Sequence, residues 1–165
     1  MKLAHTVILE GCDGAGKSHL ANWLRNTYGY AIIKTGPPAP TGNLIVTYLD
    51  ALYAAIHGQP TVLDRLHTGE CIYGPILRGV DRIGIEGMAL MEHVIANHSV
   101  RLIICSPPWE TLVAGWRHKE DLLKDENTLR TVYERYLEEA ARLGLEVYDW
   151  TAKDAEEKLK EMIEG

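Results

Sequence analysis

The chain has 165 residues, 46% of them hydrophobic, and a formal net charge of −6. This length suits one domain with a single buried core, so we expect one domain over residues 1–165. The acidic balance argues against broad, sequence-independent binding to nucleic acid, which depends on many cations facing phosphates. Three widely spaced cysteines are too few for a secreted disulfide framework, and no segment approaches the ~20 apolar residues that span a bilayer. We therefore expect a soluble cytoplasmic protein without a membrane partner.

Apolar runs of strand length alternate with longer segments of helical period, which is typical of βαβ units around a parallel sheet. The expected strands are 6–10, 31–35, 61–64, 100–106 and 146–150. The expected helices are 17–26, 43–56, 69–77, 85–97, 110–116 and 126–143. The proline-rich segment 35–42 is expected to be an irregular loop that reaches over a cleft. Together these elements predict a doubly wound α/β fold with about five parallel strands and helices on both faces.

The most specific motif is GxxxxGK[ST] at residues 11–18, which follows an apolar strand and opens a helix. In this context the glycines let successive backbone N–H groups surround a polyphosphate, and the helix N-terminus adds positive potential. We expect Lys17 to reach the β- and γ-phosphates of ATP, and Ser18 to ligate Mg²⁺. The predicted ATP-binding residues are Gly11, Asp13, Gly14, Ala15, Gly16, Lys17, Ser18 and His19.

Other residues decide which kind of phosphate-loop protein this is. The sequence has no guanine-reading NKxD string, and its DxxG string at 81–84 is interpreted as a chance turn, which argues against a GTPase. Asp64 and Arg65 end the third expected strand, at the sheet edge where parallel sheets bind ligands. Phosphoryl transfer needs a carboxylate near the metal or the attacking oxygen, and a guanidinium that holds an anionic acceptor. The sequence therefore favours a small kinase with Lys17, Asp64 and Arg65 as catalytic residues, and with Ser18 and Asp64 at the metal.

Residues 9–18, read as LEGCDGAGKS, resemble the thymidylate kinase family of nucleoside monophosphate kinases, and so does the pair Asp64-Arg65 after a strand. The resemblance implies that Asp13 approaches the 3′-hydroxyl of the acceptor and that Arg65 holds its 5′-phosphate. It implies that Asp64 serves the magnesium water shell or the acceptor oxygen. It also implies that Tyr73 lies beside the acceptor nucleoside.

The resemblance further implies a small mobile lid in the charged segment near 115–127. Arg117 is the first candidate for a catalytic cation delivered by this lid, with Lys119 and Arg130 as further candidates. The segment 150–153 follows the last expected strand, where such kinases hold adenine, and is a weak candidate for that site.

The stretch 69–79 resembles phage-encoded thymidylate-kinase-like proteins, which would act in the cytoplasm of a host. In this stretch Arg78 is a candidate second clamp for the acceptor phosphate, and Glu70 is a candidate contact to an acceptor hydroxyl. The chain has no arginine or lysine between Lys34 and Arg65, where thymidylate kinases usually carry the arginine that reads thymine.

The sequence thus predicts an ATP- and Mg²⁺-dependent phosphotransferase that acts on a deoxynucleoside monophosphate, either thymidylate-like or a modified pyrimidine. The alternatives are a kinase of hydroxymethyluracil in DNA, a deoxynucleoside kinase, and a non-enzymatic ATP-binding regulator. ATP and a nucleotide acceptor are the expected partners, modified DNA is a weaker one, and a homodimer stays open. The predicted substrate-binding residues are Asp13, Arg65, Glu70, Tyr73 and Arg78.

Overall fold

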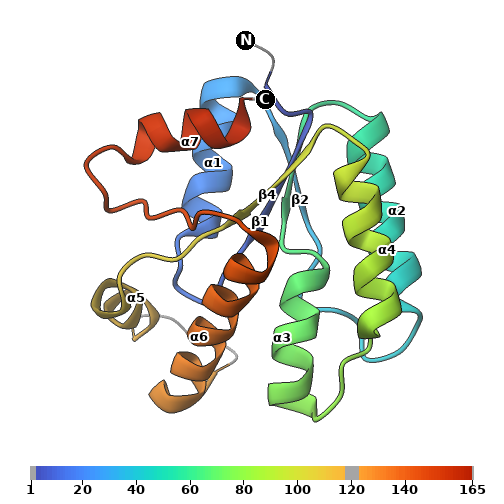
Figure 1. The fold of residues 1–165 in the computed structure, drawn as a ribbon, viewed down its shortest axis with the longest axis vertical. Helices are drawn as coiled ribbons and strands as arrows, with labels where there is room; N and C mark the ends of the chain where they lie inside the picture. Colours follow the sequence, from blue (N-terminus) through green and yellow to red (C-terminus); the bar gives the residue numbers. More distant parts are fainter. Residues whose placement is uncertain (1–2, 118–122, 165) are drawn as a thin grey trace.

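The computed structural model describes residues 3–117 and 123–164. Within this part of the chain the sheet has four parallel strands in the order β2-β3-β1-β4. The strands are β1 (Thr6–Glu10), β2 (Ala31–Lys34), β3 (Thr61–Asp64) and β4 (Val100–Ile104). The helices are α1 (Lys17–Tyr28), α2 (Leu44–His57), α3 (His67–Arg78), α4 (Gly84–Ala96), α5 (Trp109–Trp116), α6 (Glu126–Leu143) and α7 (Ala155–Ile163). Helices cover both faces of the sheet, which confirms the predicted doubly wound α/β class (Figure 1).

The central strand β1 is apolar along most of its length because it contacts helices on both faces. Val7 and Leu9 belong to the larger core, which packs against α1, α5, α6 and α7, whereas Ile8 belongs to the smaller core under α2 and α4. Successive residues of a strand point to opposite faces, so a strand covered on both sides needs apolar residues at consecutive positions. The helix α3 lies between the two groups and contacts both α4 and α6.

The expected fifth strand at 146–150 is not a strand in the structure. Pairing with the end of β4 is confined to Tyr148, whose N–H donates to the carbonyl of Ile104 and whose carbonyl accepts from the N–H of Ser106, both at 2.8 Å. The chain then turns at once, because the carboxylate of Asp149 accepts the backbone N–H of Thr151 at 2.8 Å. The prediction of about five strands is therefore corrected to four strands and one bridge in the described part of the chain.

All six expected helices appear within two residues of their predicted ends, and α6 has the predicted bounds. The carboxylate of Asp125 caps α6 by accepting the N–H of Thr128 at 2.8 Å, and Gly144 ends it in a left-handed conformation. Helix α7 was not predicted; its apolar side buries Leu159 and Ile163. Among the described residues, no helix is long and apolar enough to cross a membrane.

The DxxG string at 81–84 forms a turn, as expected. The carboxylate of Asp81 accepts the backbone N–H groups of Ile83 at 2.8 Å and Gly84 at 3.1 Å. This arrangement leads the chain from α3 into the first turn of α4, so the string has a local structural role.

We predict that protonation of His67, the first residue of α3, destabilises the fold. His67 is 1% exposed, and burial lowers its pKa to about 4, below the value of about 6.5 for an unfolded chain. The folded state therefore favours the neutral ring, and the free energy of unfolding should fall by up to about 3 kcal/mol as pH drops from 6.5 to 4. Urea denaturation at both pH values measures this loss. His67→Gln should lose less than the wild type over the same interval, and equal losses would contradict the assignment.

Candidate active site

The phosphate loop connects β1 to α1 at the carboxyl edge of the sheet, and two of its glycines are required by their surroundings. Gly11 has a φ of 140°, and a Cβ there would lie 2.4 Å from the carbonyl oxygen of Cys105. Gly16 has a φ of 90°, and a Cβ there would lie 2.7 Å from Nε1 of Trp150. Neither position can hold a side chain without moving its neighbour.

The loop has the features of an anion site. Among the described residues no side chain caps the N-terminus of α1, so the first N–H groups of this helix are available to an anion. They border a cavity of about 230 Å³, the loop cavity. Its lining residues are Asp13, Gly14, Ala15, Gly16, Lys17, Ser18, His19, Asp64 and Arg65. All the predicted ATP-binding residues except Gly11 therefore line one cavity, and their donor groups fit a polyphosphate.

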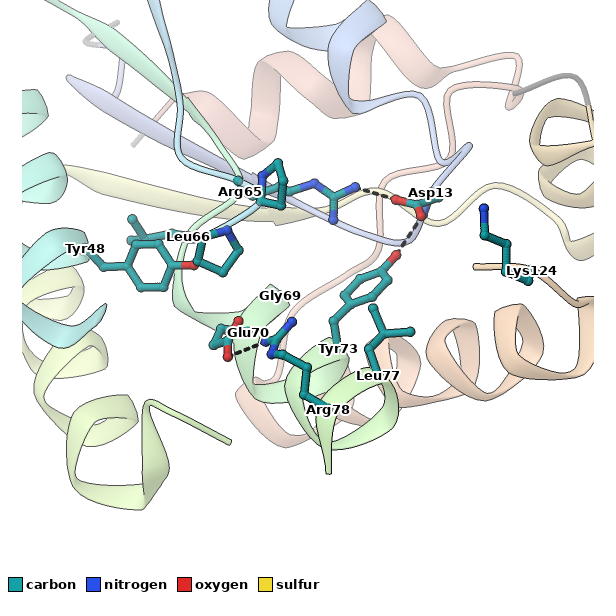
Figure 2. A pocket seen from close by; sticks show the side chains of 13 residues that line it. Asp13, Tyr48, Arg65, Leu66, Gly69, Glu70, Tyr73, Leu77, Arg78 and Lys124 are labelled. Carbon is teal, nitrogen blue, oxygen red and sulfur yellow. Dashed lines mark hydrogen bonds and ion pairs between the residues drawn. The ribbon is translucent and has the colours of Figure 1, made fainter. Parts of the chain in front are cut away.

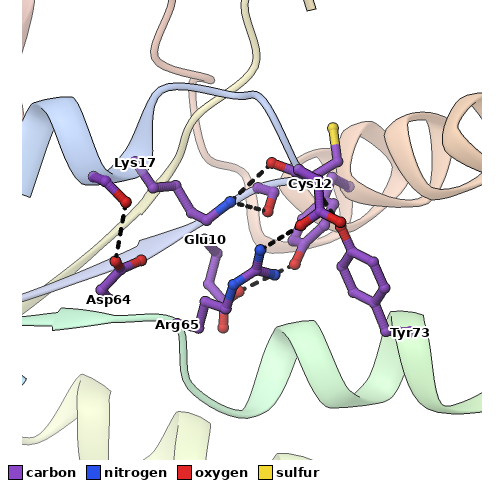
Figure 3. A network of polar contacts seen from close by, with 10 residues as sticks. Glu10, Cys12, Lys17, Asp64, Arg65 and Tyr73 are labelled. Atoms are coloured by element: carbon purple, nitrogen blue, oxygen red, sulfur yellow. Dashed lines mark hydrogen bonds and ion pairs between the residues drawn. The ribbon is translucent and has the colours of Figure 1, made fainter. Parts of the chain in front are cut away.

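Lys17 is buried within the loop. Its ammonium donates to the carbonyl oxygens of Gly11 at 2.7 Å and Cys12 at 2.8 Å (Figure 3). Burial, and then the positive charge of Arg65, lower the pKa of Lys17. A bound polyphosphate would reverse this effect, because its negative charge favours the ammonium form.

Ser18 and Asp64 lie side by side, as a magnesium site requires. The hydroxyl of Ser18 in the first turn of α1 donates to the carboxylate of Asp64, at the end of β3, over 3.5 Å. No cluster of three or more His, Cys, Asp or Glu side chains that could hold a metal occurs in the described part of the chain. The hydroxyl and carboxylate nevertheless suit Mg²⁺, which is commonly held by one or two protein oxygens, substrate phosphates and water.

Arg65 connects the loop to a second, larger cavity. Its guanidinium donates to Oδ1 of Asp13 at 2.5 Å and lies 5.4 Å from the ring centroid of Tyr73 (Figure 2). The hydroxyl of Tyr73 in turn accepts the backbone N–H of Asp13 at 3.0 Å. Loop, β3 and α3 are therefore joined by three residues that the sequence analysis assigned to the substrate site.

The backbone of Arg65 has a left-handed conformation, with a φ of 76°. Its N–H donates to the carbonyl of Leu9 at 2.9 Å, and its own carbonyl accepts the hydroxyl of Thr35 at 2.7 Å. A non-glycine residue in this conformation costs of order 1 kcal/mol or more, so its surroundings must hold it. The sharp turn directs the chain from β3 into α3.

The second cavity has a volume of about 540 Å³ and lies beside α3; we call it the acceptor cavity (Figure 2). Gly36, Pro37 and Pro38 line it, so the expected irregular loop does border a cleft. All five predicted substrate-binding residues line it as well. The full lining is Asp13, Gly36, Pro37, Pro38, Tyr48, Arg65, Leu66, Gly69, Glu70, Tyr73, Leu77, Arg78 and Lys124.

Asp13 belongs to both cavities. Its Oδ1 is held by Arg65, but its Oδ2 is buried and has no hydrogen-bond partner among the described residues. A buried carboxylate oxygen without a donor is costly, so this atom is placed to accept a proton or a hydrogen bond from a ligand.

Glu10 is a functional candidate that the sequence analysis did not single out. Its side chain is fully buried, and burial raises its pKa. One carboxylate oxygen accepts the N–H groups of Leu66 at 2.8 Å and Gly69 at 3.2 Å, and the other accepts the hydroxyl of Tyr136 at 3.2 Å. Glu10 thus fixes the start of α3, directly after Arg65. The sequence signal that could have identified Glu10 is a carboxylate at the end of a mostly apolar strand.

The predicted lid is only partly described, because residues 118–122, which include Lys119, lie outside the described residues. Arg117 pairs with Glu126 at 2.8 Å on the surface, and its side chain is 63% exposed. It is absent from the described lining of both cavities. Arg130 lies over the ring of Trp109. Lys124, which was not predicted, is the cation of this segment that lines the acceptor cavity.

The weak adenine candidate at 150–153 is adjacent to the loop. Trp150 packs against Gly16 and lines a further cavity of about 200 Å³ together with Trp23, between α1 and α7. His19 also borders this cavity, so a group bound there would be close to the phosphate loop.

We predict that Glu10→Ala lowers the free energy of unfolding by about 1–3 kcal/mol, because it leaves buried N–H groups of α3 without acceptors. Glu10→Gln should lose less, since its side-chain oxygen can still accept from Leu66 and Gly69. Equilibrium urea denaturation of the three proteins measures both losses. Equal stability of Glu10→Ala and the wild type would contradict an anchoring role.

No protein-family model matches the chain, and no curated protein matches it either. Several solved structures do match the chain. The YorR protein from Bacillus subtilis, in complex with phosphorylated GDP, has a TM-score of 0.75 at 21% identity, over 96% of this chain and 93% of that one. A deoxyadenosine kinase from M. mycoides with bound dATP has a TM-score of 0.63 at 16% identity, over 97% and 99% of the two chains. A thymidylate kinase from Ehrlichia chaffeensis has a TM-score of 0.55 at 16% identity, over 94% and 96%.

At such low identities these similarities establish the fold, which is that of P-loop kinases. The matches cover nearly the whole of both chains, so the shared architecture includes the sheet edge that carries the two cavities. Fold alone does not determine the acceptor, which must be argued from the residues of the site.

Proposed function

We propose that this chain is an ATP- and Mg²⁺-dependent phosphotransferase that transfers the γ-phosphoryl group of ATP to a deoxynucleoside monophosphate. The observation that carries this proposal is that Asp13 and Arg65 line both the loop cavity and the acceptor cavity. A donor phosphate in one cavity and an acceptor in the other would therefore meet at these two residues. The kinases that share the fold support a phosphotransferase.

The donor side holds the polyphosphate and takes up charge during transfer. Lys17 and the N–H groups at the start of α1 would contact the β- and γ-phosphates. Ser18, with Asp64 through the metal's water shell, would hold Mg²⁺, which neutralises phosphate charge when bound. Because these groups are already fixed by the fold, little reorganisation accompanies the reaction.

On the acceptor side, Arg65 would hold the acceptor phosphate in line with the γ-phosphorus. An oxygen of this phosphate forms the new bond to the γ-phosphorus, and the bond to the β–γ bridging oxygen breaks, which releases ADP. Asp13 fixes the guanidinium of Arg65 from one side, and Tyr73 contacts it from another. Lys124 adds positive charge to the same cavity.

Arg117 would supply a further cation when the lid closes over the donor. In the structure it is held by Glu126 in an exposed ion pair. Such pairs contribute at most about 1 kcal/mol, so little energy opposes its release. Closure would exclude water from the γ-phosphate and limit hydrolysis of ATP.

A second candidate function is transfer to a hydroxyl group, which is favoured by Oδ2 of Asp13, an oxygen without a hydrogen-bond partner in the described part of the chain. This oxygen could accept the hydroxyl proton as the hydroxyl oxygen attacks the γ-phosphorus and ADP leaves. A deoxynucleoside, or hydroxymethyluracil within DNA, would supply such a hydroxyl. In the monophosphate reading the same oxygen would accept a hydrogen bond from the 3′-hydroxyl.

The first test is ADP release from ATP and Mg²⁺ against a panel of acceptors. The panel holds nucleoside and deoxynucleoside monophosphates, deoxynucleosides, gluconate, and plain and hydroxymethyluracil-containing DNA. Stimulation by a monophosphate is expected. Stimulation by hydroxyl acceptors alone would select the second candidate, and ATP binding without any stimulated turnover would indicate a regulator.

We predict that Lys17→Ala abolishes measurable transfer. The Lys17 ammonium lies within the phosphate loop, where it donates to the carbonyls of Gly11 and Cys12. From there it would contact the β- and γ-phosphates, and alanine cannot replace its charge. The readout is the steady-state rate of ADP formation with the best acceptor. Arg25→Ala, at an exposed position in the last turn of α1, is the matched control and should keep the wild-type rate.

We predict that Arg65→Ala raises KM for the acceptor by about 10- to 150-fold and changes KM for ATP much less, since an unmade hydrogen bond to a charged group costs about 1.5–3 kcal/mol. The two KM values are measured by varying each substrate at saturation of the other. Equal acceptor KM values in variant and wild type would remove Arg65 from its assigned role.

A further inference from the structure

Glu70 and Arg78 form an ion pair along α3 that belongs to the acceptor cavity. A nitrogen of the Arg78 guanidinium, Nη2, donates to Oε1 of Glu70 at 2.5 Å (Figure 2). The Glu70 side chain is 2% exposed, whereas that of Arg78 is 38% exposed. The Arg78 side chain is therefore accessible from the cavity, whereas almost no solvent reaches the Glu70 side chain.

The helix backbone provides the space for this pair. A Cβ on Gly74 would lie 2.6 Å from the carbonyl oxygen of Val80, 3.0 Å from Oε1 of Glu70 and 3.3 Å from Nη2 of Arg78. The pair thus lies directly against the helix at the one position between its members that has no side chain. Arg78 is held in place over two turns of α3 by a carboxylate that almost no solvent reaches, which fixes the direction of its guanidinium.

The charges of the acceptor cavity are distributed unevenly. Near the phosphate loop, Arg65 and Lys124 line the cavity together with the carboxylate of Asp13, so that part of the lining carries net positive charge (Figure 2). Arg78 is neutralised by Glu70. An anionic group is therefore favoured beside Arg65, and an uncharged polar group is favoured beside Arg78.

Tyr48 of α2 closes the cavity on the side of this neutral pair. Burial, followed by the negative charge of Glu70, raises the pKa of Tyr48, so its phenol stays protonated. Leu66 and Pro37 add apolar surface. Apolar walls with a few fixed donors are typical of a pocket for a planar, uncharged ring.

We propose that Arg78 donates a hydrogen bond to an exocyclic carbonyl oxygen of the acceptor's base, and that Glu70 is the residue that positions it. This inference rests on the proposed function, because it takes the acceptor to be a nucleotide with its phosphate at Arg65. Thymine and uracil carry this oxygen at the base edge away from the sugar, as does guanine, whereas cytosine and adenine carry an amino group there. A guanidinium only donates, so it pairs with the oxygen and not with the amino group. The site therefore selects keto bases.

The sequence alone suggested a phosphate clamp for Arg78. The charge balance favours the base contact, because both arginines are paired with a carboxylate and the additional positive charge of the described lining, that of Lys124, lies beside Asp13 and not beside Arg78 (Figure 2). Four of the five guanidinium N–H donors remain for a base carbonyl, since one is directed at Glu70.

The experiment compares dUMP with dCMP, which differ at the carbon where uracil has an oxygen and cytosine an amino group. The wild type should have a kcat/KM for dUMP at least about tenfold higher than for dCMP. Arg78→Ala should reduce this ratio to about twofold or less and leave KM for ATP unchanged. Arg78→Lys, a smaller change that keeps the charge, should give an intermediate ratio. Arg25→Ala should keep the wild-type ratio.

Glu70→Gln tests the positioning role. It should lower the dUMP:dCMP ratio toward that of Arg78→Ala, because the guanidinium loses its charged partner. In the Arg78→Ala background, Glu70→Gln should change the ratio no further, whereas a merely structural role for Glu70 would add its own effect. Urea midpoints establish that each variant is folded.

The following results would overturn the inference. The dUMP:dCMP ratio could be unchanged in both Arg78→Ala and Arg78→Lys, the wild type could prefer dCMP, or deoxyuridine 3′,5′-bisphosphate could be preferred through Arg78, which would make it an anion clamp. The ratio of the dissociation constants of dUMP and dCMP, measured by calorimetry, tests the same preference without catalysis. If the wild type binds dUMP more tightly than dCMP through Arg78 but transfers no phosphate, the inference stands and the proposed phosphotransferase is contradicted. If the wild type binds neither dUMP nor dCMP, the inference is overturned.

Discussion

The buried carboxylate of Glu10 is the interaction on which the candidate site depends. It accepts backbone N–H groups at the start of α3, so the last residue of β1 fixes the helix that carries Glu70, Tyr73 and Arg78. One of these N–H groups belongs to Leu66, the residue after Arg65, so the contact also supports the left-handed backbone of Arg65. A hydrogen-bonded buried acid thus joins the phosphate loop, the β3–α3 turn and the acceptor cavity into one rigid unit.

Each arginine that faces the acceptor cavity has a buried carboxylate as its partner, Asp13 for Arg65 and Glu70 for Arg78. Such pairs add little net stability, because the cost of removing both charges from water offsets their attraction. Their effect is geometric. They hold flexible side chains in fixed directions before a ligand arrives, which reduces the entropy lost on binding.

The sequence predicted what depends on local pattern and failed where distant residues decide. The phosphate loop, the Asp64-Arg65 edge and the bounds of α6 followed from motif, periodicity and capping residues. The fifth strand failed because only Tyr148 reaches β4 before Asp149 turns the chain. The pairing of Glu70 with Arg78 was not foreseen either, since it depends on the close approach of both side chains to the helix at Gly74.

The missing side chain at Gly74 makes three positions of α3 interdependent. A side chain at 74 would meet the carbonyl oxygen of Val80 and both members of the ion pair, and loss of either Glu70 or Arg78 would leave the other as an unpaired charge at the cavity. Intermediates that change one position at a time would therefore be impaired. Acceptor preference along this helix should diverge between lineages in concerted steps, with the glycine, the acid and the arginine retained or replaced together.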